Sequence, residues 1–213
     1  MKAIVGKPFR RTPVFSGTVT YLVLNPSWYV PDNIAKLDLL PKIKSDKEYL
    51  QKQKIKVLKG WGETALEVNA DTIDWKQITV KNLPFRFQQD PGPFNALGTV
   101  KFMFPNKFNV YLHDTPAKEL FLKTSREFSS GCIRIEKPLE LAHYLLKDQP
   151  QWTYARLEKL IKEGTEQTVK IPKPIPIYLL YWTVWVDEQN HLQFRKDIYS
   201  RDQALIEALM QKE

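Results

Sequence analysis

The chain has 213 residues, which is long enough for one large domain or for one domain with an insertion. Hydrophobic residues make up 43% of it and charged residues 26%, proportions typical of a globular protein with a core, and no apolar run approaches the roughly 18–20 residues of a membrane span. The net charge of +8 is compatible with nucleic acids, anionic membranes or acidic polymers as partners and does not choose among them.

The beginning of the chain has the pattern of extended segments. Pro8 and Pro13 interrupt residues 3–24, and residues 18–24 are rich in the β-branched and aromatic side chains that favour strands. The first six residues lack the apolar region of about 7–15 residues that a signal peptide requires.

Residues 25–82 are too many for an ordinary loop between two sheet-like regions, so we interpret them as an insertion with its own structure. We expect a short helix over residues 32–40 with Asp32 as its N-cap, a second helix starting at Ser45 and a strand over residues 54–58. The tryptophans of this stretch either pack a small local core or line a substrate path. They are Trp28, Trp61 and Trp75.

After the insertion, we expect residues 83–89 to bring the chain back to the main sheet. Strands are predicted over residues 99–104 and 110–112, and the second of these delivers His113 at its end. A rigid strand that presents a polar residue on the following loop is a common arrangement for catalytic groups.

The last third of the chain has two helical patterns and then an apolar one. Helices are predicted over residues 138–147 and 152–163, the second ended by Gly164. Three prolines between residues 172 and 176 predict an extended linker. Two strands are expected after it, a buried one over residues 177–186 and a second one over residues 192–195.

Cys132 is the only cysteine, which excludes an internal disulfide, and His113 lies upstream of it. A thiol is only a few per cent thiolate at neutral pH, so a catalytic cysteine needs a neighbouring imidazole or a backbone that favours the anion. His113 can supply the imidazole, and Asp114 can hold that ring through its carboxylate or its backbone carbonyl. A lone cysteine is most often a buried hydrophobe, but Cys132 is flanked by polar residues rather than by an apolar run.

The run from Ser129 to Cys132 has the composition of a tight turn. Glycine lets the backbone approach a substrate closely, and consecutive N–H groups can point at a developing oxyanion. The N–H groups of Cys132, Gly131 and Ser130 are therefore candidates for an oxyanion hole. Together with the thiol and the imidazole, they indicate acyl transfer through a thioester.

These residues resemble the signature of the L,D-transpeptidase catalytic domain of the YkuD type. The family pattern is a histidine followed by Gly, Ser or Asp, and then S-x-G-C-[IV]-R, which HDTP and SSGCIR match in order and at family-like spacing. Further segments resemble the long-form members of Gram-negative envelopes, so the resemblance covers nearly the whole chain. These segments are VGKPFRRTPVF, VLNPSWYVP, LPFRFQQDPGPFNALG, KFMFPN and IPIYLLYWTVWV.

The resemblance implies a mainly β fold with a few helices, in which a YkuD-like β-sandwich or sheet core carries an α-containing capping insertion at residues 26–82. It also implies that residues 1–213 are a fragment of the catalytic domain that lacks the first strands. The family's opening hairpin would then be absent, and a strand within residues 3–24 would be left at a sheet edge without its neighbour. Because the family works outside the cytoplasmic membrane, we expect the protein in the periplasm or cell envelope, with its export signal on the part left out.

The function implied by the resemblance is that of a peptidoglycan L,D-transpeptidase with no cofactor and no metal. Cys132 would attack the carbonyl of the third residue of a tetrapeptide stem, a diaminopimelate, and the terminal D-alanine would leave. An amine of another stem would then take the acyl group, which gives a third-to-third cross-link. His113 would act as base and then as acid. Carbapenem β-lactams are expected to acylate the same thiol, because the family's cysteine attacks that strained ring.

Supporting roles follow from the same resemblance. The carbonyl of Asp114 would orient His113, although the carboxylate remains a competing partner. Arg134 either binds a substrate carboxylate in a bidentate manner or buttresses the loop. Ser129 and Tyr111 would support the catalytic and substrate-binding residues of the site.

Two alternatives remain from other classes of protein. In an L,D-carboxypeptidase, water takes the acyl group with the same cysteine and histidine, so only the products separate it from a transpeptidase. A non-catalytic module that binds wall polymer or nucleic acid is the second alternative. Against nucleic acid, the sequence has no recognised binding motif and only its charge.

Overall fold

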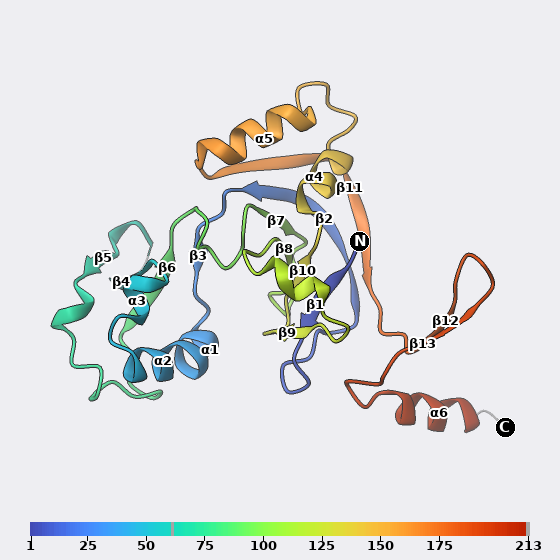
Figure 1. The fold of residues 1–213 in the computed structure, drawn as a ribbon, viewed down its shortest axis with the longest axis horizontal. Coiled ribbons are helices and arrows are strands. Elements are labelled where there is room, and N and C mark those ends of the chain that lie inside the picture. The colour runs from blue at the N-terminus through green and yellow to red at the C-terminus, as the bar shows by residue number, and fades with distance from the viewer. Residues whose placement is uncertain (61, 212–213) are drawn as a thin grey trace.

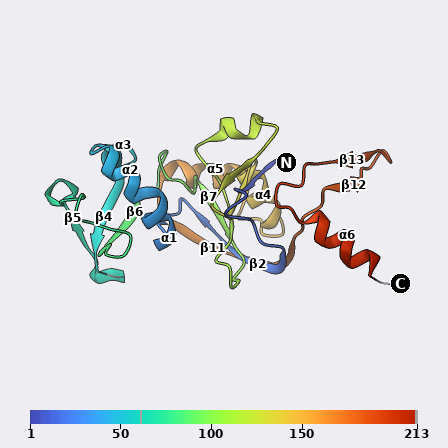
Figure 2. The same ribbon diagram turned by 90° about the horizontal axis from the view of Figure 1, so that it is seen from below.

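The computed structural model describes residues 1–60 and 62–211 and leaves out the side chain of Glu63. Trp61, one of the tryptophans considered for a local core, lies outside the described residues. Figure 1 shows a central sheet body with an inserted unit on its left and a C-terminal arm at its lower right. Figure 2, seen from below, shows the same three parts side by side along the horizontal axis.

Seven strands form the large sheet, in the order β11-β2-β7-β8-β10-β1-β9. They are β1 (Ala3–Gly6), β2 (Phe15–Leu24), β7 (Val100–Met103), β8 (Leu112–His113), β9 (Glu127–Ser129), β10 (Ile133–Ile135) and β11 (Gln167–Leu179). β8 runs parallel to β10 and β1 runs parallel to β9, whereas the other neighbours are antiparallel. The mainly β fold with few helices is confirmed.

One face of this sheet carries the main hydrophobic core. Alternate residues of a strand point to the same face, and the buried ones include Leu22 of β2, Phe102 of β7 and Ile133 of β10. Two helices pack into the same core, α4 (Pro138–Leu145) and α5 (Tyr154–Glu163). Their buried or adjoining members are Ala142, Leu146 and Leu157. Both helices confirm the sequence prediction.

The prediction of an unpaired edge strand near the start of the chain is wrong. β1 lies between β10 and β9, and β2 lies between β11 and β7. The edges of the sheet are β11 and β9, which come later in the sequence. Long-range pairing therefore covers the early strands, and no local pattern in residues 3–24 could indicate that.

The prolines after residue 171 do not form a linker, because Pro172, Pro174 and Pro176 lie within β11. The pairing of β11 with β2 shifts register between Lys170 and Ile175, which leaves part of this run outside regular pairing. Proline is tolerated in a strand at an edge or a bulge, where its missing N–H removes no necessary ladder hydrogen bond.

The inserted unit has a sheet of its own, in the order β3-β6-β4-β5. Its strands are β3 (Trp28–Tyr29), β4 (Ile55–Lys59), β5 (Leu66–Val68) and β6 (Phe85–Gln89). Its helical segments are α1 (Asp32–Ile34), a π-helical segment (Ala35–Leu39), α2 (Leu40–Ser45), α3 (Tyr49–Lys52) and two 3₁₀ turns (Gly62–Thr64 and Ala70–Thr72). A separate hydrophobic cluster that includes Ile43, Val57 and Phe87 fills it, and Trp28 and Trp75 pack against that cluster.

Three expectations for this region are wrong. The second helix does not start at Ser45, because α2 ends there and α3 begins at Tyr49. Residues 85–89 pair with β3 and β4, so the chain returns to the large sheet only at β7. The N-cap of α1 is Pro31, and Asp32 lies in the first helical turn, where its carboxylate forms an ion pair with Arg86.

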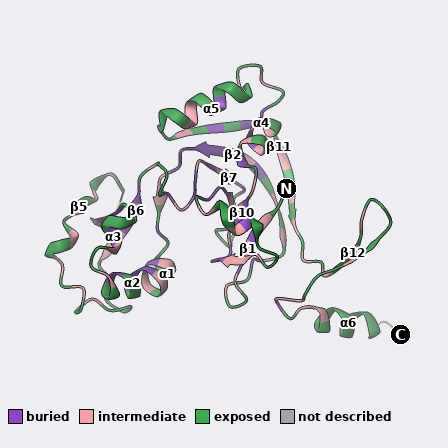
Figure 3. Ribbon diagram, in the orientation of Figure 1, coloured by how far each residue is buried: buried purple, intermediate pink, exposed green. Residues whose placement is uncertain are grey.

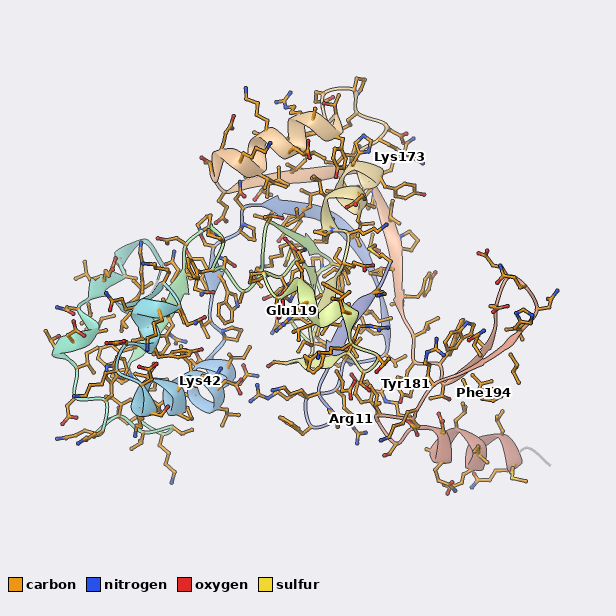
Figure 4. The ribbon with its side chains drawn as sticks, in the orientation of Figure 1. Arg11, Lys42, Glu119, Lys173, Tyr181 and Phe194 are labelled. Carbon is orange, nitrogen blue, oxygen red and sulfur yellow. The ribbon has the colours of Figure 1, made fainter. Side chains whose placement is uncertain are left out.

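The C-terminal arm comprises the hairpin β12 (Val184–Val186) and β13 (Leu192–Phe194) and the helix α6 (Asp202–Met210). The buried strand expected over residues 177–186 is wrong, because Trp182 is 66% exposed and the stretch is divided between β11 and β12. Figure 3 shows the arm mostly in the colour of exposed residues, and Figure 4 places Tyr181 at its base and Phe194 farther out. None of the described helices is both long enough and apolar enough to cross a membrane.

Candidate active site

The strand register brings the candidate catalytic residues onto the sheet face opposite the main core. In the parallel pair of β8 and β10, Leu112 lies beside Ile133 and His113 lies beside Arg134. Because Ile133 points into the core and strands alternate, His113, Cys132 and Arg134 share the other face. The side chain of Tyr111 lies on this face too, two residues before His113.

His113 is buried, and its Nδ1 lies 2.5 Å from the backbone carbonyl oxygen of Asp114. A carbonyl oxygen can only accept a hydrogen bond, so Nδ1 carries the proton of the neutral ring. The other ring nitrogen, Nε2, is therefore unprotonated. This tautomer has its free acceptor available for a proton from a nucleophile.

The carboxylate of Asp114 is held elsewhere. Its Oδ2 accepts from the backbone N–H of Thr99 at 2.9 Å and from the Thr99 hydroxyl at 2.8 Å. Its Oδ1 accepts from the Thr115 N–H at 2.7 Å and forms an ion pair with Lys118. Of the two Asp114 groups considered from the sequence, the carbonyl is the one in contact with His113.

The turn before Cys132 is stabilised by Ser129. The Gly131 N–H donates to Ser129 Oγ at 3.1 Å, and Ser129 Oγ donates to the carbonyl of Cys132 at 2.5 Å. Gly131 has a φ of +117°, a region that favours glycine. The N–H of Gly131 is thus used inside the turn, and the remaining oxyanion-hole candidates from the sequence are those of Ser130 and Cys132.

The surroundings of Cys132 and His113 favour the neutral form of each side chain. Burial raises the pKa of the Cys132 thiol, although the Tyr111 N–H and hydroxyl and the charges of Lys101 and Arg134 act in the opposite direction. Burial lowers the pKa of His113 to about 3, and the neighbouring charge of Arg134 adds to this effect. These directions favour a neutral thiol and a neutral imidazole on this face of the sheet over a thiolate–imidazolium pair.

The sequence pattern of the YkuD family, described as the L,D-transpeptidase catalytic domain, matches residues 1–171. The chain belongs to this family. A protein of Haemophilus influenzae named "Putative L,D-transpeptidase" is 36% identical over 204 residues, which cover 96% of this chain and 40% of that protein. The chain thus spans about two fifths of that relative's length.

A cavity of about 220 Å³ lies between this YkuD domain's large sheet and the inserted unit. Arg134 and Trp28 line it, together with residues 115–117 and, from the inserted unit, side chains that include Tyr49. Trp28 is also hydrogen-bonded to Tyr111, whose hydroxyl contacts the Cys132 thiol. A larger hollow of about 880 Å³ lies within the inserted unit and its neighbouring loop, and none of the candidate catalytic residues lines it.

The turn before Cys132 is also held from outside by contacts that the sequence does not indicate. Arg10 donates to the Ser130 hydroxyl at 2.8 Å and forms an ion pair with Asp38 of the inserted unit. The Thr12 hydroxyl donates to the carbonyl of Gly131 at 3.0 Å. Sequence position gives no signal for these contacts, because each joins residues far apart in the chain.

Among the residues that the structure describes, no group of three or more His, Cys, Asp and Glu side chains is arranged to hold a metal ion. His143 packs edge-on against Tyr154, and His191 lies on the arm near Asp187.

The neutral resting state leads to a prediction about thiol reactivity. In the free protein, the rate of Cys132 alkylation by iodoacetamide should increase with pH through pH 9 and beyond, because burial raises the thiol pKa above its ordinary value of 9.0. Intact mass spectrometry at each pH measures the rate. A preformed thiolate–imidazolium pair would instead give a reactive plateau below pH 7, and such a plateau would contradict the neutral state.

Proposed function

We propose that this domain is a peptidoglycan L,D-transpeptidase in which Cys132 is the nucleophile and His113 is the proton carrier. The observation that carries the proposal is the hydrogen bond between His113 Nδ1 and the Asp114 carbonyl, on the same sheet face as the only cysteine. It leaves Nε2 as a base for the thiol. Membership of the YkuD family supports the reaction class.

The first half of the reaction would form a thioester. Cys132 Sγ attacks the carbonyl of the third residue of a tetrapeptide stem while His113 Nε2 takes the thiol proton. The oxyanion faces the backbone N–H groups of Ser130 and Cys132. The C–N bond then breaks, and His113 gives its proton to the amine of the leaving D-alanine.

The second half would transfer the acyl group. An amine of another stem enters the site, and His113 removes its proton as it attacks the thioester carbonyl. The C–S bond breaks and His113 returns the proton to the thiolate, which restores the starting state. Acceptance by an amine gives the third-to-third cross-link, whereas acceptance by water gives the product of a carboxypeptidase.

The surrounding residues have supporting roles in this proposal. Arg134 binds the terminal carboxylate of the donor, since its Nε is buried and has no hydrogen-bond partner among the described residues. Ser129 holds the nucleophile turn, and Tyr111 contacts the thiol. The inserted unit caps the cavity beside Arg134. A peptidoglycan substrate assigns the protein to the periplasm or cell envelope.

The test is intact mass spectrometry after incubation with a disaccharide tetrapeptide. Wild-type protein should gain the mass of the donor without D-alanine, and cross-linked dimer should appear in solution. The Cys132→Ala variant should show neither product. A carbapenem should add its full mass to wild type alone.

Failure would take a specific form. Folded wild-type protein with neither a donor adduct nor a carbapenem adduct would contradict the proposal. Adducts that persist in Cys132→Ala would contradict the assignment of the nucleophile. The ratio of dimer to free tripeptide separates transpeptidase from carboxypeptidase.

A further inference from the structure

A second cation stands beside His113 on the strand opposite Arg134. Lys101 of β7 pairs with His113 in the antiparallel ladder, while Arg134 of β10 pairs with the same residue from the other side. Phe102, the next residue of β7, points into the main core, so Lys101 lies on the face of His113. Its ammonium is 4.3 Å from the centre of the Tyr111 ring.

Lys101 lacks the partner that a half-buried cation usually has. Among the side chains that the structure describes, no carboxylate lies within ion-pair distance of its ammonium, which lies against the face of the Tyr111 ring. Glu166 acts on Lys101 only from farther away, and its carboxylate accepts the backbone N–H of Ser27. Burying a charge without an opposite charge is costly.

Arg134 likewise has no ion-pair partner among the described carboxylates. The two cations, one on either side of His113, therefore form an arrangement suited to an anion. Burial lowers the pKa of Lys101 and of Arg134, because it disfavours the charged form of each side chain. A ligand with carboxylates at both positions would remove this cost. A donor with one carboxylate would satisfy only one cation.

We propose that Lys101 binds a carboxylate on the side chain of the donor residue that Cys132 acylates. This inference rests on the proposed function and makes its donor a peptide with two carboxylates, the terminal one at Arg134 and the side-chain one at Lys101. The 220 Å³ cavity lies on the Arg134 side and suits a small leaving residue. The side chain of the acylated residue is then directed toward β7.

A purely electrostatic role is the rival explanation for Lys101. On the face of Lys101, the titratable or charged neighbours come from two segments, and Glu166 acts from the segment before β11. They are Tyr111, just before β8, His113 of β8, Cys132, just before β10, and Arg134 of β10. The partner of Lys101 on β2 is Val23, which is apolar. A lysine that only stabilises the thiolate would aid all donors equally, whereas one that binds a carboxylate would discriminate between donors.

The experiment compares two tetrapeptide donors that differ only at the end of the third side chain, a carboxylate in one and a carboxamide in the other. Rates of Cys132 acylation give kcat/KM for each donor, and calorimetry on Cys132→Ala protein gives their affinities. The variants are Lys101→Met and Lys101→Arg. The control is Lys147→Met, since Lys147 lies 4.5 Å from the Tyr144 ring on α4 and is exposed.

Wild type and Lys147→Met should both prefer the carboxylate donor by about 10- to 100-fold, the effect typical of one hydrogen bond to a charged group. Lys101→Met should lose this preference, because it weakens the carboxylate donor much more than the carboxamide donor. A smaller loss common to both donors is expected, because the Lys101 charge also lowers the pKa of the Cys132 thiol. Lys101→Arg should keep part of it, because it retains the charge.

Two results would overturn the inference, namely equal use of both donors by wild type, or an equal loss on both donors in Lys101→Met. Failure of the proposed function looks different. In that case wild type forms no thioester, while Cys132→Ala protein still binds the carboxylate donor more tightly and loses that preference when Lys101→Met is added. That result would support the anion site and reject the chemistry.

Discussion

Replacing His113 with glutamine is expected to slow the acylation of Cys132 by a tetrapeptide donor by about 10²- to 10⁴-fold, the usual contribution of a general base. Glutamine can fill part of the space and hydrogen-bond, but it cannot take the thiol proton. Because the resting thiol is neutral, the attack depends on that proton transfer. The time course of the thioester mass measures the loss.

His143→Gln is the matched control, since that ring lies on α4 and packs against Tyr154 away from Cys132. It should leave the acylation rate unchanged. A folded His113→Gln protein that is acylated within about threefold of wild type would remove His113 from the proposed mechanism.

His113→Gln also has a signature in stability. The unfolded chain takes up a proton at His113 as pH falls below 6.5, whereas in the folded protein the pKa is lowered to about 3. Wild type should therefore lose unfolding free energy as pH falls from 6.5 toward 3, and the glutamine variant should lose less in that window. Urea unfolding at several pH values compares the two slopes.

The second large effect is expected at Gly98, which lies next to Thr99 and against the Asp114 side chain. Its φ is +62°, and an added Cβ would lie 2.4 Å from the Asp114 Cγ. Gly98→Ala combines backbone strain with overpacking, each of which costs about 1–3 kcal/mol. Relief requires the Asp114 carboxylate to move away from Thr99, which also moves the carbonyl that fixes the tautomer of His113.

We therefore expect Gly98→Ala to lower both the unfolding free energy and the acylation rate. Gly164→Ala isolates the strain, because Gly164 has a similar φ of +73° with nothing within 4 Å of an added Cβ. It should cost about 1 kcal/mol, as loss of a favourable helix end does, and leave acylation unchanged. Equal stability losses in the two variants would show that contact with Asp114 adds nothing.

The central part of the site was predictable because its residues lie in two short segments of the sequence. A strand that ends at His113 and a tight turn before Cys132 are local patterns, and the structure has both. The choice between the carbonyl and the carboxylate of Asp114 was not local. It depends on Thr99 and Lys118, which occupy the carboxylate in the folded protein.

The predictions that failed depend on which other segment a strand or side chain contacts, and a local sequence pattern does not specify that. β6 was assigned to the wrong sheet because an alternating strand pattern does not specify its partner. The apolar run near Trp182 has the pattern of a buried strand, whereas the arm leaves it exposed. Lys101 was overlooked because one lysine in a strand gains meaning only when the register with His113 is known.

Tyr199 has a consequence for how this domain can be divided. Its hydroxyl donates to the Gly6 carbonyl and accepts from the Thr12 N–H, and Thr12 in turn holds Gly131. The match to the YkuD family ends at residue 171, so every motif residue lies inside it and this tyrosine lies outside. The boundary defined by sequence similarity therefore excludes a residue that supports the turn before Cys132. The shortest segment that contains all the motif residues is therefore shorter than the shortest segment that holds them in position.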